Sequence, residues 1–403
     1  MRIPKTVSRR GFWGRTAGAA AWASQRILGA NGKIGVAVVG TVGRGRYLTS
    51  VFKEDPAAEI RAVCGVYQPN LDRGLAAAGA AAKTYHDHRR LLEDKNIAAV
   101  VIATPDHWHA QMILDAVAAG KDAYVEKPMC HTIEEGFRII DAVRKSRRVV
   151  SVGTQRRSYD LFLEGKKIVD SGRLGQVHLV TAWWMNHQQS LRSAKLEGKL
   201  DWQRWLGPSP PRPLDPARFF NWYYFWDYSG GMMVGQGAHI IDAIHWFMNA
   251  TFPSAVSSSA AKPHLAGAET PETTSITIEY PEDFVAVFSV GYRAMRYGPA
   301  NDQIKQFHGT QARLDMRRES YSLYPESSEE ILRPETERQQ FGSLGRATRA
   351  HVANFLDCIK TRHDPNATVE MGQQTNVVLC LAMESLRSRR RLRWNATARR
   401  SEG

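Results

Sequence analysis

Five short apolar runs that alternate with helical segments are the feature that most constrains the fold of this chain. Each run is almost continuously apolar, which is typical of a strand buried on both faces. One helical segment, 132–146, begins with Thr132 and has Glu135 three residues later, the pattern of a capping box. Strands that alternate with helices predict a parallel, doubly wound α/β sheet over residues 31–155. The apolar runs lie at 33–40, 59–67, 98–105, 122–128 and 148–154.

The pattern changes after residue 155. Longer apolar runs follow, several of them alternating with polar residues, and loops rich in proline and aromatic residues separate them. Such runs favour a second α+β domain, over residues 156–403, with a large and mostly antiparallel open sheet. The runs lie at 176–184, 274–280, 284–292 and 311–316, and two late helices are predicted at 351–361 and 372–388.

A glycine-rich turn joins the first predicted strand to a helix, in the sequence "VVGTVGRGRYL". A strand–glycine turn–helix unit points backbone amides and a helix N-terminus at a pyrophosphate. The middle glycine of the usual G-x-G-x-x-G spacing is absent, because Val42 stands there. A plain tight turn is the alternative, but the position in a strand–helix series favours dinucleotide binding. The predicted contacts are Gly40, Thr41, Val42, Gly43, Arg44 and Gly45.

The end of the second predicted strand should offer an acid to the adenosine ribose. It reads Cys-Gly-Val-Tyr-Gln, with Gly65 where the acid is expected and Tyr67 as a further cofactor contact. Asp72 lies only in the following loop, and Arg73 beside it suits a 2′-phosphate. The sequence therefore leaves NAD and NADP both open as the cofactor.

The segment "AYVEKPMC" places Glu126 and Lys127 at the end of a buried strand and stops the strand with Pro128. Ligands of open α/β sheets sit beyond the carboxyl ends of the strands, so both charges point at the crevice of the phosphate loop. The proline restricts Lys127 to an extended backbone and allows a cis peptide bond. A partly desolvated lysine beside a cofactor can transfer a proton near neutral pH. The alternative is a structural ion pair at the sheet edge.

The net charge of +14 raises the question of nucleic-acid binding, but its distribution argues against a basic footprint on the fold. Residues 1–30 hold six basic residues and no acid, and 387–400 hold seven arginines and no acid. Taking these six and seven charges from +14 leaves +1 for the rest of the chain. We therefore expect no nucleic-acid partner.

The N-terminal segment 1–30 has the pattern of an export signal. Arg9 and Arg10 are paired, Phe12 follows, and a short run of small apolar residues comes next. This resembles a twin-arginine signal, which carries folded proteins out of the cytoplasm, and predicts a periplasmic location. A disordered basic arm is the alternative. The apolar run is short and contains Arg15, so no membrane insertion is expected.

Four segments together carry a resemblance to a known family. They are "ATPDHWHAQMILDAVAAGKDAYVEKP", "VGTQRRS", "LDWQRWLGPSPPRP" and "GGMMVGQGAHIIDAIHW". They resemble the glucose–fructose oxidoreductase / inositol dehydrogenase family (Gfo/Idh/MocA), in particular its exported, twin-arginine-signalled members, over nearly all of 31–395. The resemblance implies a Rossmann domain that binds NAD or NADP. It also implies an open sheet that forms dimers or tetramers, and redox chemistry at a secondary alcohol of a sugar.

The resemblance also assigns residues. Lys127 matches the family's proton-transfer lysine, and Glu126 matches its partner for the nicotinamide ribose. Thr104, Pro105 and His109 match positions near the cofactor.

The segment 230–246 carries a second set of candidates. The family pattern is an aspartate, a histidine four residues later and an aspartate three beyond that, and His239 and Asp242 match the last two. His239 is thus a second proton-transfer candidate, and Asp242 a substrate-binding or orienting residue, unless the histidine is a buried structural one. Arg156 and Arg157 lie at the domain junction, where they bind substrate or serve the fold. His245 is rotated away from His239, and no metal site is predicted.

Three positions depart from the family pattern: Val42, Gly65 and Gly235, the last where the first aspartate is expected. The leading hypothesis is an NAD(P)-dependent oxidoreductase that acts on a carbohydrate, with Lys127 and His239 moving the proton. A second is a hydrolase, lyase or epimerase that retains and recycles its nicotinamide. A third is a sugar-binding relative that has lost the cofactor.

Overall fold

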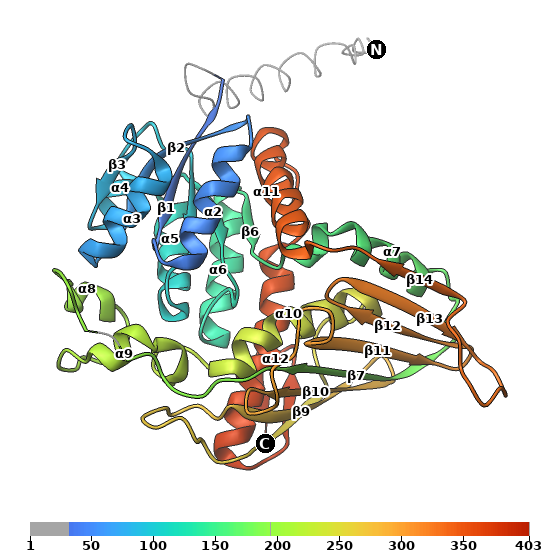
Figure 1. Cartoon of the computed structure of the whole chain (residues 1–403). Helices are drawn as coiled ribbons and strands as arrows, with labels where there is room; N and C mark the ends of the chain where they lie inside the picture. The colour runs from blue at the N-terminus through green and yellow to red at the C-terminus, as the bar shows by residue number, and fades with distance from the viewer. Residues whose placement is uncertain (1–31, 194, 403) are drawn as a thin grey trace, which may run out of the picture.

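The computed structural model describes residues 32–193 and 195–402, which are organised by two β-sheets (Figure 1). The predicted signal segment, 1–30, lies outside the described residues. Within the described part of the chain, every helix is too short or too polar to cross a bilayer.

The first sheet has six parallel strands in the order β3-β2-β1-β4-β5-β6. Each of the five apolar runs predicted from the sequence forms one strand, so the doubly wound parallel sheet is confirmed. The edge strand β3 was not predicted, because it has only three residues and two of them are exposed. The strands are β1 (Ile34–Val39), β2 (Ala58–Cys64), β3 (Lys83–Tyr85), β4 (Ala99–Ile102), β5 (Asp122–Val125) and β6 (Val150–Val152).

Helices cover both faces of this sheet. One face packs against α5 (His109–Ala118) and α6 (Ile133–Ser146), and the predicted capping box of Thr132 and Glu135 is present. The other face packs against α2 (Gly43–Glu54) and α3 (Gln68–Ala78).

A third helix on the second face comes from far along the chain. Val352, Phe355, Leu356 and Ile359 of α11 (Ser343–Thr361) join the core formed by β1, β4 and α2. Figure 1 shows α11 beside α2, although the sequence assigned this segment to the second domain. The apolar stripe of the helix predicted burial but could not specify the sheet that buries it.

The second sheet has ten strands in the order β14-β13-β12-β11-β7-β10-β9-β8-β15-β16. All its strand pairs are antiparallel except β7 with β10, so the mostly antiparallel sheet is confirmed. Helices α7 (Asp160–Asp170), α10 (Gly231–Met248) and α12 (Val369–Ser388) pack into its core. The strands are β7 (Val177–Met185), β8 (Ala255–Ala260), β9 (Thr273–Tyr280), β10 (Phe284–Gly291), β11 (Gln303–Gly309), β12 (Ala312–Arg317), β13 (Ser320–Pro325), β14 (Thr336–Gln339), β15 (Leu392–Asn395) and β16 (Arg400–Glu402).

A long connection between β7 and α10 returns to the first domain, and we call its described residues, 186–193 and 195–229, the strap. It contains α8 (Trp202–Leu206), α9 (Pro216–Phe220) and the 3-10 turn η3 (Trp222–Tyr224). Tyr67 forms a β-bridge with Leu200, and the indole nitrogen of Trp108 donates a 2.8 Å hydrogen bond to the Trp205 carbonyl. The strap therefore covers the carboxyl ends of β2 and β4.

Candidate active site

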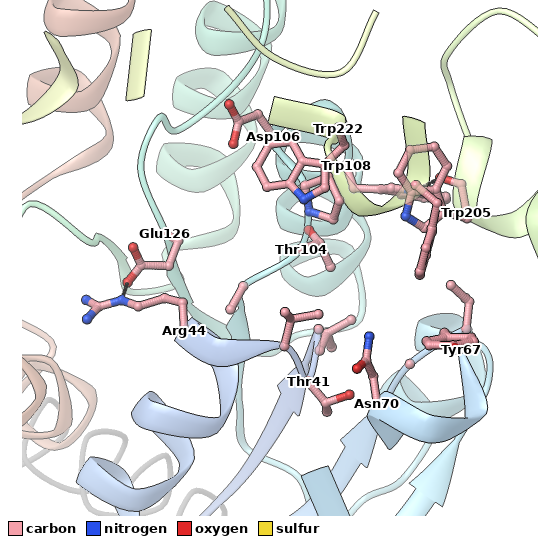
Figure 2. A pocket seen from close by; sticks show the side chains of 18 of the residues that line it. Thr41, Arg44, Tyr67, Asn70, Thr104, Asp106, Trp108, Glu126, Trp205 and Trp222 are labelled. Carbon is pink, nitrogen blue, oxygen red and sulfur yellow. Dashed lines mark hydrogen bonds and ion pairs between the residues drawn. The ribbon is translucent and has the colours of Figure 1, made fainter. Parts of the chain in front are cut away.

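A cavity of about 1050 Å³ lies where the phosphate loop, the ends of β2, β4 and β5, the strap and α10 meet. Figure 2 shows Arg44 and Glu126 at one end of it and Tyr67 at the other, with Trp205 and Trp222 of the strap opposite Thr41. A volume of this size accommodates a dinucleotide-sized ligand. Every predicted cofactor-binding residue lines it except Gly43 and Gly45.

Two glycines set the shape of the phosphate loop. Gly40 has a φ of +90°, in the left-handed region that favours glycine. A Cβ on Gly45 would overlap the Gly40 carbonyl oxygen, so Gly45 permits close packing of α2 and is not itself on the cavity wall. Val42 has an extended backbone (φ −82°) and a side chain that is 52% exposed. The missing middle glycine therefore imposes no backbone strain, and the loop keeps a shape that fits a pyrophosphate.

Gly65 has a packing role at the end of β2. A Cβ there would lie 3.1 Å from Thr41 Oγ1, and a Cβ on Gly74 would overlap the Thr41 methyl group. Thr41 is only 2% exposed, so it is held between two glycines. A side chain at position 65 would press on this threonine, which would have to shift slightly.

The cavity wall near Tyr67 carries charges of both signs. Arg73 of α3 lines it, as do Lys195 and Glu197 of the strap. The backbone amide of Glu197 donates a 2.9 Å hydrogen bond to the Tyr67 hydroxyl oxygen, which fixes the strap at this end. Glu197 can accept a hydrogen bond from a ribose hydroxyl, and the cations suit a 2′-phosphate. The residues at this end of the cavity therefore suit either NAD or NADP.

Lys127 lies on the floor of the cavity. Its peptide bond to Pro128 is cis, and its Nζ donates a 2.9 Å hydrogen bond to the Gly235 carbonyl oxygen of α10. Burial lowers the pKa of Lys127 below its usual value of 10.5, against the opposing charges of Glu126 and Asp106. A lysine in this state loses its proton more readily than an exposed one.

Glu126 pairs with the phosphate loop and not with Lys127. Its Oε1 accepts a 2.7 Å hydrogen bond from Arg44 Nε. The alternative of an ion pair between Glu126 and Lys127 is therefore wrong. The two side chains point apart, and Arg44, which lies 82 residues earlier in the sequence, neutralises the carboxylate. Because both members of the pair line the cavity, the carboxylate remains close to where a ribose would lie.

Two further polar groups position the loops around Lys127. The ring nitrogens of His109 lie 2.6 Å from the Pro128 oxygen and 3.0 Å from the Thr104 oxygen, so this histidine ties the end of β4 to the loop after β5. Asp106 is 3% exposed and accepts a 2.6 Å hydrogen bond from Ser229.

His239 lines the cavity together with Lys127, as the sequence predicted. Its Nδ1 is buried and finds no hydrogen-bond partner within the described part of the chain. Burial, together with the nearby charge of Lys127, holds the pKa of His239 well below 6.5. The ring is therefore neutral at neutral pH, and a neutral imidazole that lines the cavity can donate or accept a hydrogen bond.

The other predicted substrate contacts lie behind the cavity wall. Arg157 Nε donates to both carboxylate oxygens of Asp242, at 2.9 and 3.1 Å, and both side chains are almost fully buried. Arg156 hydrogen bonds to Gln303 and lies over the rings of Phe162 and Trp184. The structure places these three side chains in the core and gives no support to substrate contact by them.

Sequence reasoning missed several cavity residues. Tyr223 of η3, Gln155 and Asp106 line the same cavity as Lys127 and His239. Tyr223 was hidden in the aromatic segment "FFNWYYFWDY", in which most rings pack in the core. Over residues 32–193 and 195–402 no cluster of three or more potential metal ligands is found.

A strand–glycine turn–helix unit, a dinucleotide-sized cavity and a lysine at the end of β5 define a two-domain, dinucleotide-binding α/β protein. Two family models match the chain. One, described as the NAD-binding Rossmann fold of an oxidoreductase family, covers residues 34–154. The other, described as the C-terminal alpha/beta domain of that family, covers residues 166–393. The chain belongs to this Gfo/Idh/MocA oxidoreductase family, so the family predicted from the sequence is confirmed.

Individual relatives are more distant. An inositol 2-dehydrogenase of Saccharopolyspora erythraea is 28% identical over 215 residues, which are 52% of this chain and 53% of that protein. An inositol 2-dehydrogenase/D-chiro-inositol 3-dehydrogenase of Lactiplantibacillus plantarum is 24% identical, over 61% of each chain. The chain thus spans little more than half the length of these curated relatives. A levoglucosan dehydrogenase solved with NADH and levoglucosan has a TM-score of 0.73 at 17% identity, over 90% of this chain and 99% of that one.

Proposed function

We propose that this protein is an NAD(P)-dependent oxidoreductase that acts on a secondary alcohol of a sugar or polyol. The observation that carries the proposal is the placement of Lys127: a partly buried lysine with a lowered pKa, in a cavity shared with the phosphate loop. The inositol and levoglucosan dehydrogenases among its relatives support the substrate class.

Different residues of the chain would bind the cofactor and transfer the proton. Gly40, Val42 and Arg44 would hold the pyrophosphate, and Glu126 the nicotinamide ribose. A bound nicotinamide would supply the oxidant that accepts two electrons and a hydrogen from the substrate carbon. Lys127, in its neutral form, takes the proton of the substrate hydroxyl, and the neutral ring of His239 holds a neighbouring hydroxyl or relays the proton.

The test is turnover by Lys127→Ala and Lys127→Arg, followed as NADH formation with myo-inositol, levoglucosan and common hexoses. General-base catalysis contributes about 10²–10⁴-fold, so both variants should lose at least about 10²-fold in kcat while binding NADH normally. Lys121→Met is the matched control. Lys121 is a buried lysine that donates hydrogen bonds to carbonyl oxygens, but it lies just before the first residue of β5, at the end of the strand away from Lys127. Wild-type turnover by Lys127→Ala would refute the assignment.

The strap favours a second candidate function, redox-neutral chemistry with a retained cofactor. The Gln68 amide donates to the Lys199 carbonyl and the Asp201 amide to the Val66 carbonyl, both at 2.9 Å. These bonds hold the strap across the adenosine side of the cavity and oppose cofactor release. Protein purified by gel filtration, denatured and assayed for NAD(P) would then carry about one cofactor per chain and form no net NADH during turnover. A cofactor-free protein that binds no NADH would instead support the non-catalytic relative.

We also propose that residues 1–30 direct export by the twin-arginine route. The support is the Arg9-Arg10 pair followed by Phe12. A double Arg9→Lys/Arg10→Lys variant should keep the protein out of the periplasmic fraction, with Arg15→Lys as the control. Equal periplasmic amounts of wild type and double variant would refute this.

We further propose that the second sheet mediates dimer or tetramer formation. The side chains of Leu179, Thr181 and Trp183 alternate along β7 with the buried Val180, Ala182 and Trp184 and are partly exposed. Leu179→Glu should lower the mass measured by light scattering. A wild-type mass equal to one chain, 45.2 kDa for the full sequence, would refute it.

A further inference from the structure

Gly235 of α10 lies at the position where the family resemblance implies an aspartate, and the structure shows what uses the vacated space. A Cβ on Gly235 would overlap the hydroxyl oxygen, Cζ and Cε2 of Tyr223. The end of the Tyr223 ring thus rests against the bare Cα of Gly235. Glycine at this position is what allows the tyrosine hydroxyl to enter the site.

Tyr223 and Lys127 meet at the same residue. Lys127 Nζ donates to the carbonyl oxygen of Gly235 at 2.9 Å, while the Tyr223 hydroxyl contacts the Cα of Gly235. Both side chains line the cavity, together with His239 and Asp106. The strap brings the tyrosine, the loop after β5 brings the lysine, and α10 supplies the surface on which they converge.

We propose that Tyr223 is a second catalytic residue of this site, whose hydroxyl donates a hydrogen bond to the oxygen of the reacting alcohol while Lys127 takes the proton of that alcohol. The proposal rests on the proposed function. The proton passes from the alcohol oxygen to Lys127 Nζ, and a bound oxidised nicotinamide would accept the hydride, one proton with two electrons, that leaves the carbon. Tyr223 keeps its own proton throughout.

The chemistry of the surroundings agrees with a donor in this position. Burial, with the nearby charge of Asp106, keeps the pKa of Tyr223 well above 10, so the hydroxyl remains protonated. A neutral donor aimed at the reacting oxygen stabilises the negative charge that develops there. A carboxylate at the same place would instead pair with Lys127 and raise its pKa. The tyrosine therefore leaves Lys127 free to act as a base at lower pH.

The first test is Tyr223→Phe, which keeps the ring and removes only the hydroxyl. We expect kcat on the best alcohol of the panel to fall about 10²-fold, the usual effect of losing one such donor, with an unchanged dissociation constant for NADH. Tyr224→Phe is the matched control, because Tyr224 is the neighbouring residue but packs in the core of the second domain. A kcat for Tyr223→Phe within twofold of wild type would overturn the proposal.

The second test exchanges the two groups. Gly235→Asp alone should lose turnover, since its side chain collides with Tyr223. In Tyr223→Ala/Gly235→Asp the carboxylate has room, and turnover should recover with the acid limb of its pH profile moved to higher pH, because the carboxylate raises the pKa of Lys127. Double-variant turnover no higher than that of Gly235→Asp would contradict the shared position.

The proposal can be separated from the proposed function. If wild-type protein binds NADH but oxidises no alcohol of the panel, the proposed function fails. Labelling of Lys127 by acetic anhydride over a pH series, read by peptide mass spectrometry, then decides on Tyr223. A hydroxyl beside the ammonium stabilises its charge, so Lys127 should react at lower pH in Tyr223→Phe and at higher pH in the double variant. Identical labelling curves for wild type and Tyr223→Phe would overturn the placement of the hydroxyl.

Discussion

Asp242 offers a test that separates a structural role from substrate binding. Asp242→Asn removes one charge of the buried pair with Arg157, whose two side chains are 2% and 4% exposed. The variant leaves a guanidinium in the core without its counter-ion. Breaking a buried pair in this way costs about 3–5 kcal/mol, a large part of the stability of an ordinary domain.

The assay is urea unfolding at pH 7, followed by tryptophan fluorescence. With an m value of about 3 kcal/mol per molar urea, the midpoint should fall by roughly 1–2 M. The double variant Arg157→Met/Asp242→Leu removes both charges and keeps the volume. It should recover most of the loss, because a buried ion pair replaced by apolar residues of similar size is often neutral or stabilising.

Kinetics complete this test. At concentrations of urea that leave each variant folded, Asp242→Asn should keep the wild-type KM for the alcohol, since Asp242 lies outside the cavity lining. A midpoint within about 0.3 M of wild type, combined with a strongly raised KM, would refute the structural reading. That result would indicate that Asp242 contacts the substrate, as the sequence analysis predicted.

Two further predictions concern the phosphate loop and two buried histidines. Gly45→Ala should weaken NADH binding more than tenfold and destabilise the fold by about 1–3 kcal/mol, because its Cβ would overlap the Gly40 carbonyl oxygen. Gly43→Ala is the control and should change neither quantity, since its Cβ meets nothing within 4 Å. Equal effects of the two variants on NADH affinity, measured by fluorescence titration, would contradict this reasoning. Burial lowers the pKa of both His107 and His245 to about 3. The unfolded chain therefore binds protons that the folded chain does not, and stability should fall as the pH drops from about 6.5 toward 3, by about 1.4 kcal/mol per pH unit for each group. The pH dependence of the free energy of unfolding, measured by urea unfolding at pH 5 and 7, should be smaller in His245→Leu by the contribution of one histidine. An unchanged pH dependence would show that His245 takes up a proton in the folded protein.

The sequence was a good guide to the first sheet because its signals are local. Each strand is a short apolar run, and the capping box of Thr132 and Glu135, a pattern only four residues long, marks the start of α6. Lys127 could be placed for the same reason, since the carboxyl end of a parallel strand fixes the edge of the sheet to which it points.

The interior of the site could not be predicted in the same way, because it is built from contacts between distant segments. Arg44 neutralises Glu126 although the two lie 82 residues apart in the sequence, and Tyr223 occupies the space beside Gly235 only because the strap folds back. No periodicity in the sequence reports either contact. The departures at Val42, Gly65 and Gly235 looked like three losses of function. In the structure they are an unstrained loop, a packing contact with Thr41 and an opening for a tyrosine.

The return of α11 to the first sheet has a consequence for how the protein is made. Phe355 of this helix packs edge to face against Phe52 and Tyr124, yet the helix begins only at Ser343. A ribosome that adds about 5–20 residues per second needs roughly 10–40 s between the last strand of the first sheet and this helix. During that interval α2 and α3 can cover this face of the cofactor domain, but the part that α11 covers stays exposed on the growing chain. The domain can therefore close its core, and capture a dinucleotide in its final geometry, only after nearly the whole chain has been synthesised.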